Sequence, residues 1–297
     1  MTGRFAPSPS GRMHLGNAFS ALMSWLYVRK NGGTMVMRIE DLDKIRCKKE
    51  YCDLVKEDLA WLGLDWDLEV PMQSTRGEAY EAALARLGSL GVLFDCACSR
   101  ADLGASSAPH ASDGHVIYSG RCRDLPDEQK RIIASNPHSV RVKVPQRIIT
   151  FCDRIYGEYS QDLAKECGDF VLKKADGMYA YQLAVVVDDI FCGVDTVVRG
   201  CDLISSTPRQ IYLYELLNET PPEYCHIPML VDSSGRKLSK RDRDCDFGYL
   251  RQSLSPQRVV GRLAFMSGLI DRDEPVSAGE LLQIFDIERI KKQNIAL

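Results

Sequence analysis

Two stretches of this chain combine residue types and spacing that could bind a polyphosphate. The first covers residues 4–17, where a Gly/Ser/Pro-rich turn leads into a helical pattern. The N-terminus of a helix presents unpaired backbone N–H groups, and a phosphate is favoured there. His14 could donate to an oxyanion at this turn, and Gly16 would let a flat ligand approach the backbone closely. An ordinary strand-to-helix turn with a capping histidine is the alternative.

The second stretch is a glycine-led basic loop that ends in Lys237-Leu238-Ser239-Lys240-Arg241. Its cations and its serine suit a polyphosphate, with Lys240 as a mobile point charge. A solvated basic loop is the alternative here, because most charge runs are no more than that. The two stretches together, in this order, are more informative than either one alone.

Alternating strand and helix patterns surround the first stretch, and glycines end the helices. The expected elements are an extended segment over 3–10, a helix over 14–30, a strand over 34–39, and helices over 48–62 and 75–90. This order predicts a parallel sheet with helices on its faces. It would place the turn with His14 at the end of the first strand.

The composition changes over residues 95–175, where close cysteines and alternating strand patterns predict an inserted domain. A hairpin is expected at Ala175-Asp176-Gly177, between strands over 170–174 and 178–183. A helix is then expected over 208–217, with Thr207 as its N-cap. After Lys237 we expect helices to the end of the chain.

At this point the chain resembles the class I aminoacyl-tRNA synthetases. His14-Leu15-Gly16-Asn17 stands in the place of their HIGH motif, and the basic loop stands in the place of KMSKS. Segments that resemble the glutamyl group follow in order: RFAPSPSG at 4–11, RIEDLD at 38–43, WLGL at 61–64, YQLAVVVDD at 181–189 and VRGCDL at 198–203. Departures from the motifs, such as Asn17 and Arg241, are variations common in that group.

Two further features indicate a truncated branch of the glutamyl group. Only 56 residues follow Arg241, which is too few for the large helical anticodon-binding region of full-length glutamyl-tRNA synthetases. The pattern Cys96-x-Cys98, Tyr118, Cys122 is similar to the zinc site of the glutamyl-Q tRNA(Asp) synthetases, which attach glutamate to queuosine in tRNA(Asp). The chain is identified on these grounds as a member of that family.

The resemblance implies an α/β fold, with a Rossmann-like class I synthetase catalytic core, a zinc-containing insertion domain and a C-terminal helical segment. The expected domains are the first half of the catalytic domain at 1–93, the zinc-binding insertion at 94–176, the second half of the catalytic domain at 177–236, and the KMSKS-like loop with the helical segment at 237–297.

The thiolates of the insertion suit tetrahedral zinc, although Cys-x-Cys is tighter than the usual spacing and does not dictate the fourth ligand. Chemistry alone favours His110 or His115, because imidazole is a commoner ligand than phenolate. The resemblance points instead to Tyr118. The set that it implies for one structural Zn²⁺ is Cys96, Cys98, Tyr118 and Cys122. Separate buried thiols are the alternative.

A glutamate pocket can be read from charge, because an α-amino dicarboxylate needs cations for its carboxylates and an anion for its ammonium. Arg4 and Arg199 could supply the cations, Glu40 the anion and Tyr181 a hydroxyl, and the family uses the matching positions in this way. The RFAPSPSG segment adds Phe5, Ala6, Pro7 and Ser8 to the expected pocket. The alternatives are a surface cation at residue 4, a Glu40–Arg38 pair, and ordinary strand residues at 181 and 199.

The resemblance also implies the reaction. Glutamate would attack the α-phosphate of ATP, shielded by Mg²⁺, and form glutamyl-adenylate without tRNA. His14 would stabilise the transition state and Lys240 the leaving pyrophosphate, and the expected ATP contacts are His14, Gly16, Asn17, Lys237, Ser239 and Lys240. A hydroxyl of the queuosine cyclopentene ring in tRNA(Asp) would then take the glutamyl group. A truncated enzyme that charges the 3′ end of tRNA(Glu) and an idle tRNA-binding zinc protein remain alternatives.

Composition excludes other classes. The chain has 297 residues, 45% of them hydrophobic and 27% charged, as in a folded soluble protein. Its longest apolar run, 183–187, is far shorter than the roughly 20 residues that span a bilayer, so no membrane partner is expected. Eleven cysteines at irregular spacing, with no signal-like segment at the N-terminus, predict reduced thiols in a cytoplasmic protein. A monomer is expected.

The net charge of −3 gives no overall electrostatic attraction to RNA. Contact with tRNA would have to come from local segments. Residues 121–154 hold eight Lys/Arg against four Asp/Glu, and residues 236–262 hold eight against three. Such segments could grip phosphates or could be solvated faces.

Overall fold

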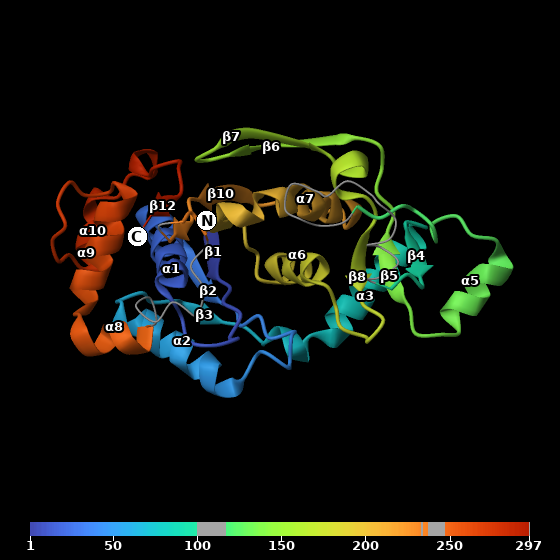
Figure 1. Ribbon diagram of the computed structural model, residues 1–297, viewed down its shortest axis with the longest axis horizontal. Helices are drawn as coiled ribbons and strands as arrows, with labels where there is room; N and C mark the ends of the chain where they lie inside the picture. Colours follow the sequence, from blue (N-terminus) through green and yellow to red (C-terminus); the bar gives the residue numbers. More distant parts are fainter. Residues whose placement is uncertain (100–116, 233, 237–246, 297) are drawn as a thin grey trace.

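The structure is a computed structural model, and it describes residues 1–99, 117–232, 234–236 and 247–296. The expected β-α-β-α order of the first part is confirmed, with one additional short strand. The elements are β1 (Thr2–Phe5), α1 (Leu15–Lys30), β2 (Thr34–Met37), α2 (Lys49–Trp61), β3 (Leu68–Glu69) and α3 (Gly77–Ser89). The strands form a parallel sheet in the order β1-β2-β3, as Figure 1 shows.

Residues 196–227 add two parallel strands beside β1. They are β9 (Thr196–Gly200) and β10 (Glu223–Ile227). Asp195 N–H donates to Thr2 O over 3.1 Å, which holds β9 next to β1. Gly3 allows α1 to lie close to this sheet, because a Cβ at that position would be only 2.3 Å from Val28 Cγ2.

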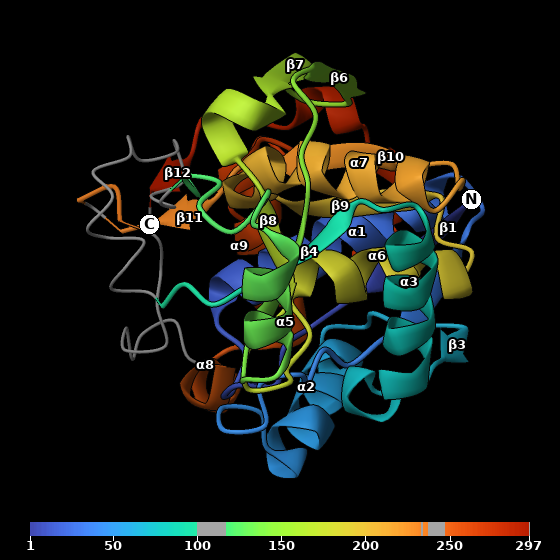
Figure 2. The same cartoon turned by 90° about the vertical axis from the view of Figure 1, so that its right-hand side faces the viewer.

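The inserted segment forms its own antiparallel sheets. Its elements are β4 (Leu93–Cys96), α5 (Asp127–Ala134), β5 (Ser139–Val142), β6 (Ile148–Asp153), β7 (Gly157–Asp162), the π-helical turn η2 (Leu163–Cys167) and β8 (Phe170–Lys173). One sheet has the order β4-β5-β8, and β6 pairs with β7. This hairpin runs over α7 and β10, as seen in Figure 1 and Figure 2, and Arg154 N–H donates to Tyr224 O. The β6–β7 hairpin therefore contacts the part of the chain that contains β10.

Two local predictions in the second half are wrong. Residues 178–183 do not form a strand, because α6 (Tyr181–Phe191) begins at Tyr181 after a single bridge at Tyr179. The segment has no β-branched residue, and in the helix its Leu183 is buried in the core that α6 shares with α3 and α7. Thr207 is not an N-cap either: it is the first residue of α7 (Thr207–Leu216), and its hydroxyl accepts from Arg199 instead.

The C-terminal part is mainly helical, as expected, and a pair of short strands was missed. Its elements are β11 (Leu230–Val231), α8 (Phe247–Ser253), α9 (Pro256–Ser267), α10 (Ala278–Ile284) and β12 (Ile295–Ala296), and 3₁₀ helices occur at η1 (Gln73–Thr75), η3 (Cys201–Ser206) and η5 (Ile287–Arg289). β12 pairs with β11 in parallel. Among the described residues, no helix has the length and apolar character needed to cross a membrane.

The core strands separate two hydrophobic cores, and this decides where their polar side chains point. Val198 packs in the core around α1, whereas Val197 packs in the core of α3, α6 and α7. Because side chains alternate along a strand, Arg199 faces α6 and α7. In β1, Phe5 packs in the α1 core, so Arg4 faces the same side as Arg199. The alternation thus directs both arginines to one face of the sheet.

Candidate active site

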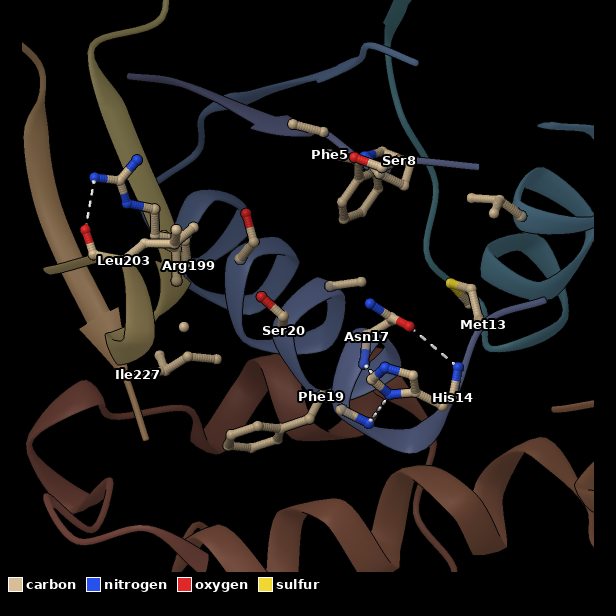
Figure 3. A pocket seen from close by; sticks show the side chains of 18 of the residues that line it. Phe5, Ser8, Met13, His14, Asn17, Phe19, Ser20, Arg199, Leu203 and Ile227 are labelled. Carbon is tan, nitrogen blue, oxygen red and sulfur yellow. Dashed lines mark hydrogen bonds between the residues drawn. The ribbon is translucent and has the colours of Figure 1, made fainter. Parts of the chain in front are cut away.

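A cavity of about 500 Å³ opens at the carboxyl ends of β1, β9 and β10, which is where ligands bind in open α/β sheets. Figure 3 shows part of its lining. The predicted site residues that line it are Arg4, Phe5, Ala6, Pro7, Ser8, His14, Gly16, Asn17, Glu40, Tyr181 and Arg199. The predicted Lys237, Ser239 and Lys240 lie outside the described residues.

Arg199 is a buried cation with uncharged hydrogen-bond partners. Its guanidinium donates to Thr207 Oγ1 (2.7 Å), Gln210 Oε1 (2.9 Å) and His226 Nε2 (3.1 Å), and contacts Tyr181 Oη at 3.5 Å. Within the described part of the chain, no carboxylate pairs with it. Only 4% of the residue is exposed, and no acid among the described residues neutralises its charge. A carboxylate ligand would supply the missing anion.

His226 and Asp153 orient the Arg199 guanidinium through a chain of hydrogen bonds. Asp153 Oδ2 lies 2.7 Å from His226 Nδ1, and both side chains are fully buried. Because His226 Nε2 accepts from Arg199, its proton lies on Nδ1 and is donated to Asp153. Burial, together with the charge of Arg199, lowers the pKa of His226 below its ordinary value. The histidine therefore stays neutral and orients Arg199 without placing a second positive charge beside it.

Arg4 and Glu40 belong to a second buried network. Asp189 Oδ1 accepts from Arg38 Nη1 over 2.5 Å and lies 3.4 Å from Arg4 Nε. Arg38 also donates to Glu40 Oε1 over 3.0 Å. Arg4 is buried, so the alternative of a surface cation is wrong. The Glu40–Arg38 pair is present, and Glu40 still lines the cavity.

Burial raises the pKa of Glu40 above its ordinary value, although the nearby charges of Arg38 and Arg4 act in the opposite direction. A cation placed next to this carboxylate would favour its ionised form. This end of the cavity therefore contains Arg199, which has no described carboxylate partner, and Glu40, whose ionised form would be favoured by a nearby cation. This is the charge pattern that an amino-acid dicarboxylate needs.

His14 caps α1, as the alternative interpretation predicted. Its Nδ1 accepts from Gly16 N–H (3.1 Å) and Asn17 N–H (3.4 Å), and Asn17 Oδ1 accepts from His14 N–H. The two amides, which the sequence predicted to be unpaired, are therefore paired with the His14 ring. Because Nδ1 is an acceptor, the proton of the neutral ring lies on Nε2. The cap thus orients the imidazole and keeps Nε2 as a hydrogen-bond donor.

Gly16 lies close to the ring that forms this cap. A Cβ at residue 16 would lie 3.0 Å from His14 Cε1 and 3.1 Å from His14 Nδ1, so the ring would have to move. We expect Gly16→Ala to lower glutamate-dependent pyrophosphate exchange about tenfold, because misplaced catalytic groups lose rate steeply. Gly279→Ala is the matched control, since nothing lies near the added methyl there. Wild-type exchange by Gly16→Ala would contradict this role.

Several positioning residues were missed by sequence reasoning. They are Asp153, Asp189, Gln210 and His226, all of them buried. Asp188 and Asp189 follow an apolar run, and His226 stands between apolar residues in a strand. A buried polar group needs a partner, so these positions carried a detectable signal, but the partner's identity was not in the local sequence.

The predicted thiol ligands lie together at the end of β4, and the alternative of separate thiols is wrong. The sulfur atoms of Cys96, Cys98 and Cys122 are all within 4.8 Å of one another. Tyr118 Oη lies 3.6 Å from Cys96 Sγ and accepts from Cys122 N–H. Tetrahedral ligands at about 2.3 Å from zinc are about 3.8 Å apart, so the cluster fits this metal. His110 and His115 lie outside the described residues.

The basic segment 121–154 is largely neutralised by neighbouring acids. The cations that form ion pairs are Arg123, Lys130, Lys143, Arg147 and Arg154. In the segment 236–262, Arg236, Arg251 and Arg258 are also paired. For the described residues of these two segments, the local excess of positive charge in the sequence therefore overstates what is offered to RNA.

Comparisons with known proteins agree with the architecture. Residues 1–294 match the family described as tRNA synthetases class I (E and Q), catalytic domain. The chain is 44% identical to the glutamyl-Q tRNA(Asp) synthetase of Symbiobacterium thermophilum over 100% of its own length and 96% of the relative's. It is 47% identical to that of Geobacter sulfurreducens over 81% and 75% of the two lengths.

Among solved structures, the chain resembles a glutamate tRNA ligase from Elizabethkingia meningosepticum in complex with its amino acid. The TM-score is 0.85 and the identity 28%, and the match covers 100% of this chain and 66% of that one. The predicted class I α/β core is thereby confirmed. The chain belongs to the class I tRNA synthetases of the E and Q group and, within it, to the glutamyl-Q tRNA(Asp) synthetases.

Proposed function

We propose that this chain activates L-glutamate with ATP as glutamyl-adenylate, without tRNA, and transfers the glutamyl group to the queuosine base of tRNA(Asp). The observation that carries the proposal is Arg199, a buried guanidinium with uncharged described partners on the wall of a cavity. A neutral or cationic substrate would leave this charge unpaired. A carboxylate of a bound dicarboxylate would pair with the Arg199 guanidinium and so offset the cost of burying its charge.

The positions of the two ends of the cavity favour one orientation of glutamate. Figure 3 shows Arg199 and His14 on opposite sides of the pocket. If His14 acts at the α-phosphate, the reacting carboxylate lies toward it, and Arg199 takes the distant side-chain carboxylate. Arg4 and Tyr181 would orient the α-carboxylate end, and Glu40 would pair with the ammonium.

In the first step, an oxygen of the α-carboxylate attacks the α-phosphorus, and the bond from that phosphorus to the bridging oxygen breaks to release pyrophosphate. His14 would donate from Nε2 to a non-bridging oxygen as charge develops there. Mg²⁺ accompanies ATP and shields its phosphates. Lys237, Ser239 and Lys240 are assigned to the phosphates from their motif alone. Catalysis is then positioning and electrostatic stabilisation, with no side-chain nucleophile.

One structural Zn²⁺ would be held by Cys96, Cys98, Tyr118 and Cys122. Burial raises the pKa of the Cys98 thiol to about 12 and raises the pKa of Tyr118 above its ordinary value. Metal binding would therefore release protons from these groups. The ion would tie the end of β4 to residues 118–122 and so stabilise the insertion.

In the second step, a hydroxyl of the cyclopentene ring of queuosine attacks the activated carbonyl and AMP leaves. The three substrates of the proposed reaction are L-glutamate, ATP and tRNA, and the cytoplasm would supply them. The names of the relatives support the choice of tRNA(Asp), and the cavity supports the choice of glutamate.

The test is to prepare bulk tRNA from strains with and without queuosine and to incubate each preparation with the protein, ATP and labelled glutamate. The experiment is then repeated with tRNA that lacks its 3′-terminal adenosine. We expect label only on queuosine-containing tRNA, in the anticodon fragment after nuclease cleavage, with or without the terminal adenosine. Label that needs the adenosine but not queuosine would indicate a truncated glutamyl-tRNA synthetase. Failure to form glutamyl-adenylate would favour an idle tRNA-binding protein.

A further inference from the structure

The turn that carries His14 and the helix α8 meet at one buried carboxylate, Asp58 of α2. Asp58 Oδ1 accepts from Arg12 Nη2 over 3.3 Å and from Arg251 Nη1 over 2.9 Å. The Asp58 side chain is fully buried, whereas each arginine side chain is 28% exposed. Arg12 lines the cavity two residues before His14, and Asp58 does not line it. The carboxylate can therefore act on a ligand only through other residues.

The main chain joins the same two elements. Phe247 N–H, at the start of α8, donates to Met13 O over 3.1 Å. The Phe247 side chain is fully buried and meets the Trp61 ring edge to face at 5.9 Å. The Arg251 guanidinium lies 5.4 Å from the centre of the Trp61 ring. Helix α2 thus forms a platform on which residues 12–14 and α8 are held together.

Packing alone does not require an acid at this point, because an apolar side chain would fill a buried position between helices at lower desolvation cost. Charge gives the acid a role. Without it, two arginines would face each other across the junction of the His14 turn and α8. Asp58 Oδ2 and Arg12 Nε are buried and have no hydrogen-bond partner in the described part of the chain, so one oxygen carries the whole bridge.

We propose that Asp58 is a positioning residue for the activation step, which holds Arg12, and with it the turn of His14, against α8. This inference rests on the proposed function, in which ATP binds at the His14 end of the cavity. It assigns to Asp58 an effect on ATP and none on glutamate, since the Arg199 end of the cavity lies on the opposite side (Figure 3).

The test is Asp58→Asn, which keeps the shape of the side chain and removes its charge. We expect kcat/KM for ATP in pyrophosphate exchange to fall at least about tenfold, the size expected for lost hydrogen bonds to charged groups. KM for glutamate should stay within about twofold of the wild type. Asp53→Asn, the same change on the exposed side of α2, should have no effect on either constant.

A folded Asp58→Asn protein with wild-type kcat/KM for ATP would overturn the proposal, and so would equal losses for ATP and glutamate. If Asp58 acts through Arg12, the double variant Asp58→Asn/Arg12→Gln loses no more than the worse single variant, whereas additive losses contradict this. If Asp58→Asn does not fold, Arg251→Gln tests the same bridge from a partly exposed position, and unchanged ATP kinetics would then overturn it. Wild-type protein without any exchange would refute the proposed function instead, and the affinity of an ATP analogue, measured by calorimetry, would still test Asp58.

Discussion

The Arg199→Gln variant is expected to lower kcat/KM for glutamate in pyrophosphate exchange by about a hundredfold to a thousandfold. Truncating one partner of a buried, hydrogen-bonded charge pair costs about 2–5 kcal/mol, and each 1.4 kcal/mol corresponds to about a factor of ten. The effect should be this large because the arginine is buried and none of its described hydrogen-bond partners carries a charge that could take its place. KM for ATP should change little.

Two companion variants separate charge from geometry at this position. Arg199→Lys keeps the charge but loses the fork that donates to Thr207, Gln210 and His226, so its activity should lie between those of the wild type and Arg199→Gln. Arg147→Gln, at an exposed position paired with Glu215, is the control and should be neutral. The ratio of glutamate to glutamine activation should also fall in Arg199→Gln. If glutamate kinetics were unchanged, Arg199 would not bind the substrate.

Removal of a thiol from the cluster should abolish metal binding. Zinc per chain, measured by emission spectrometry, is expected to be close to one in the wild type and close to zero in Cys98→Ser. Structural zinc sites contribute folding free energy directly, so the melting temperature should fall and backbone hydrogen exchange in β4 and β5 should rise. Cys152→Ser is the control, because Cys152 is an exposed free thiol of the same insertion.

The fourth ligand can be tested in the same way. Tyr118→Phe removes only the hydroxyl that lies between Cys96 and Cys122, and it should weaken zinc binding without abolishing it. Alanine at His110 or His115 should leave zinc unchanged. Zinc absent from the wild type, or retained in full by Cys98→Ser, would refute the metal site.

Local structure was predictable where short-range chemistry decides it. Helices α1, α2 and α3 end next to glycines with positive φ, at Gly32, Gly63 and Gly91, and the sequence predicted all three ends. The strand expected over 178–183 failed because the segment has no β-branched residue and its Leu183 is buried in the core of α3, α6 and α7. Thr207 failed as a cap because a distant arginine takes its hydroxyl.

The residues that line the glutamate site were predictable from the sequence, but the residues that orient them were not. The residues proposed for glutamate lie in short recognisable segments, and the structure places all of them on one cavity. The residues that orient them were not recognised. Asp153 lies in the insertion, and His226 lies on the last core strand, yet the two meet behind Arg199.

The sequence by itself determined the family, the α/β class and the charges available for substrate, because these depend on contiguous motifs and on residue types. Only the tertiary structure decided how those charges are used. It showed that Nδ1 of His14 accepts hydrogen bonds from the helix that His14 caps. It also showed that the described hydrogen-bond partners of Arg199 are uncharged, and that Arg12 and Arg251 both donate to Asp58. The physical reason is that burial and pairing join side chains far apart in the chain, and a charge acquires its strength from those neighbours.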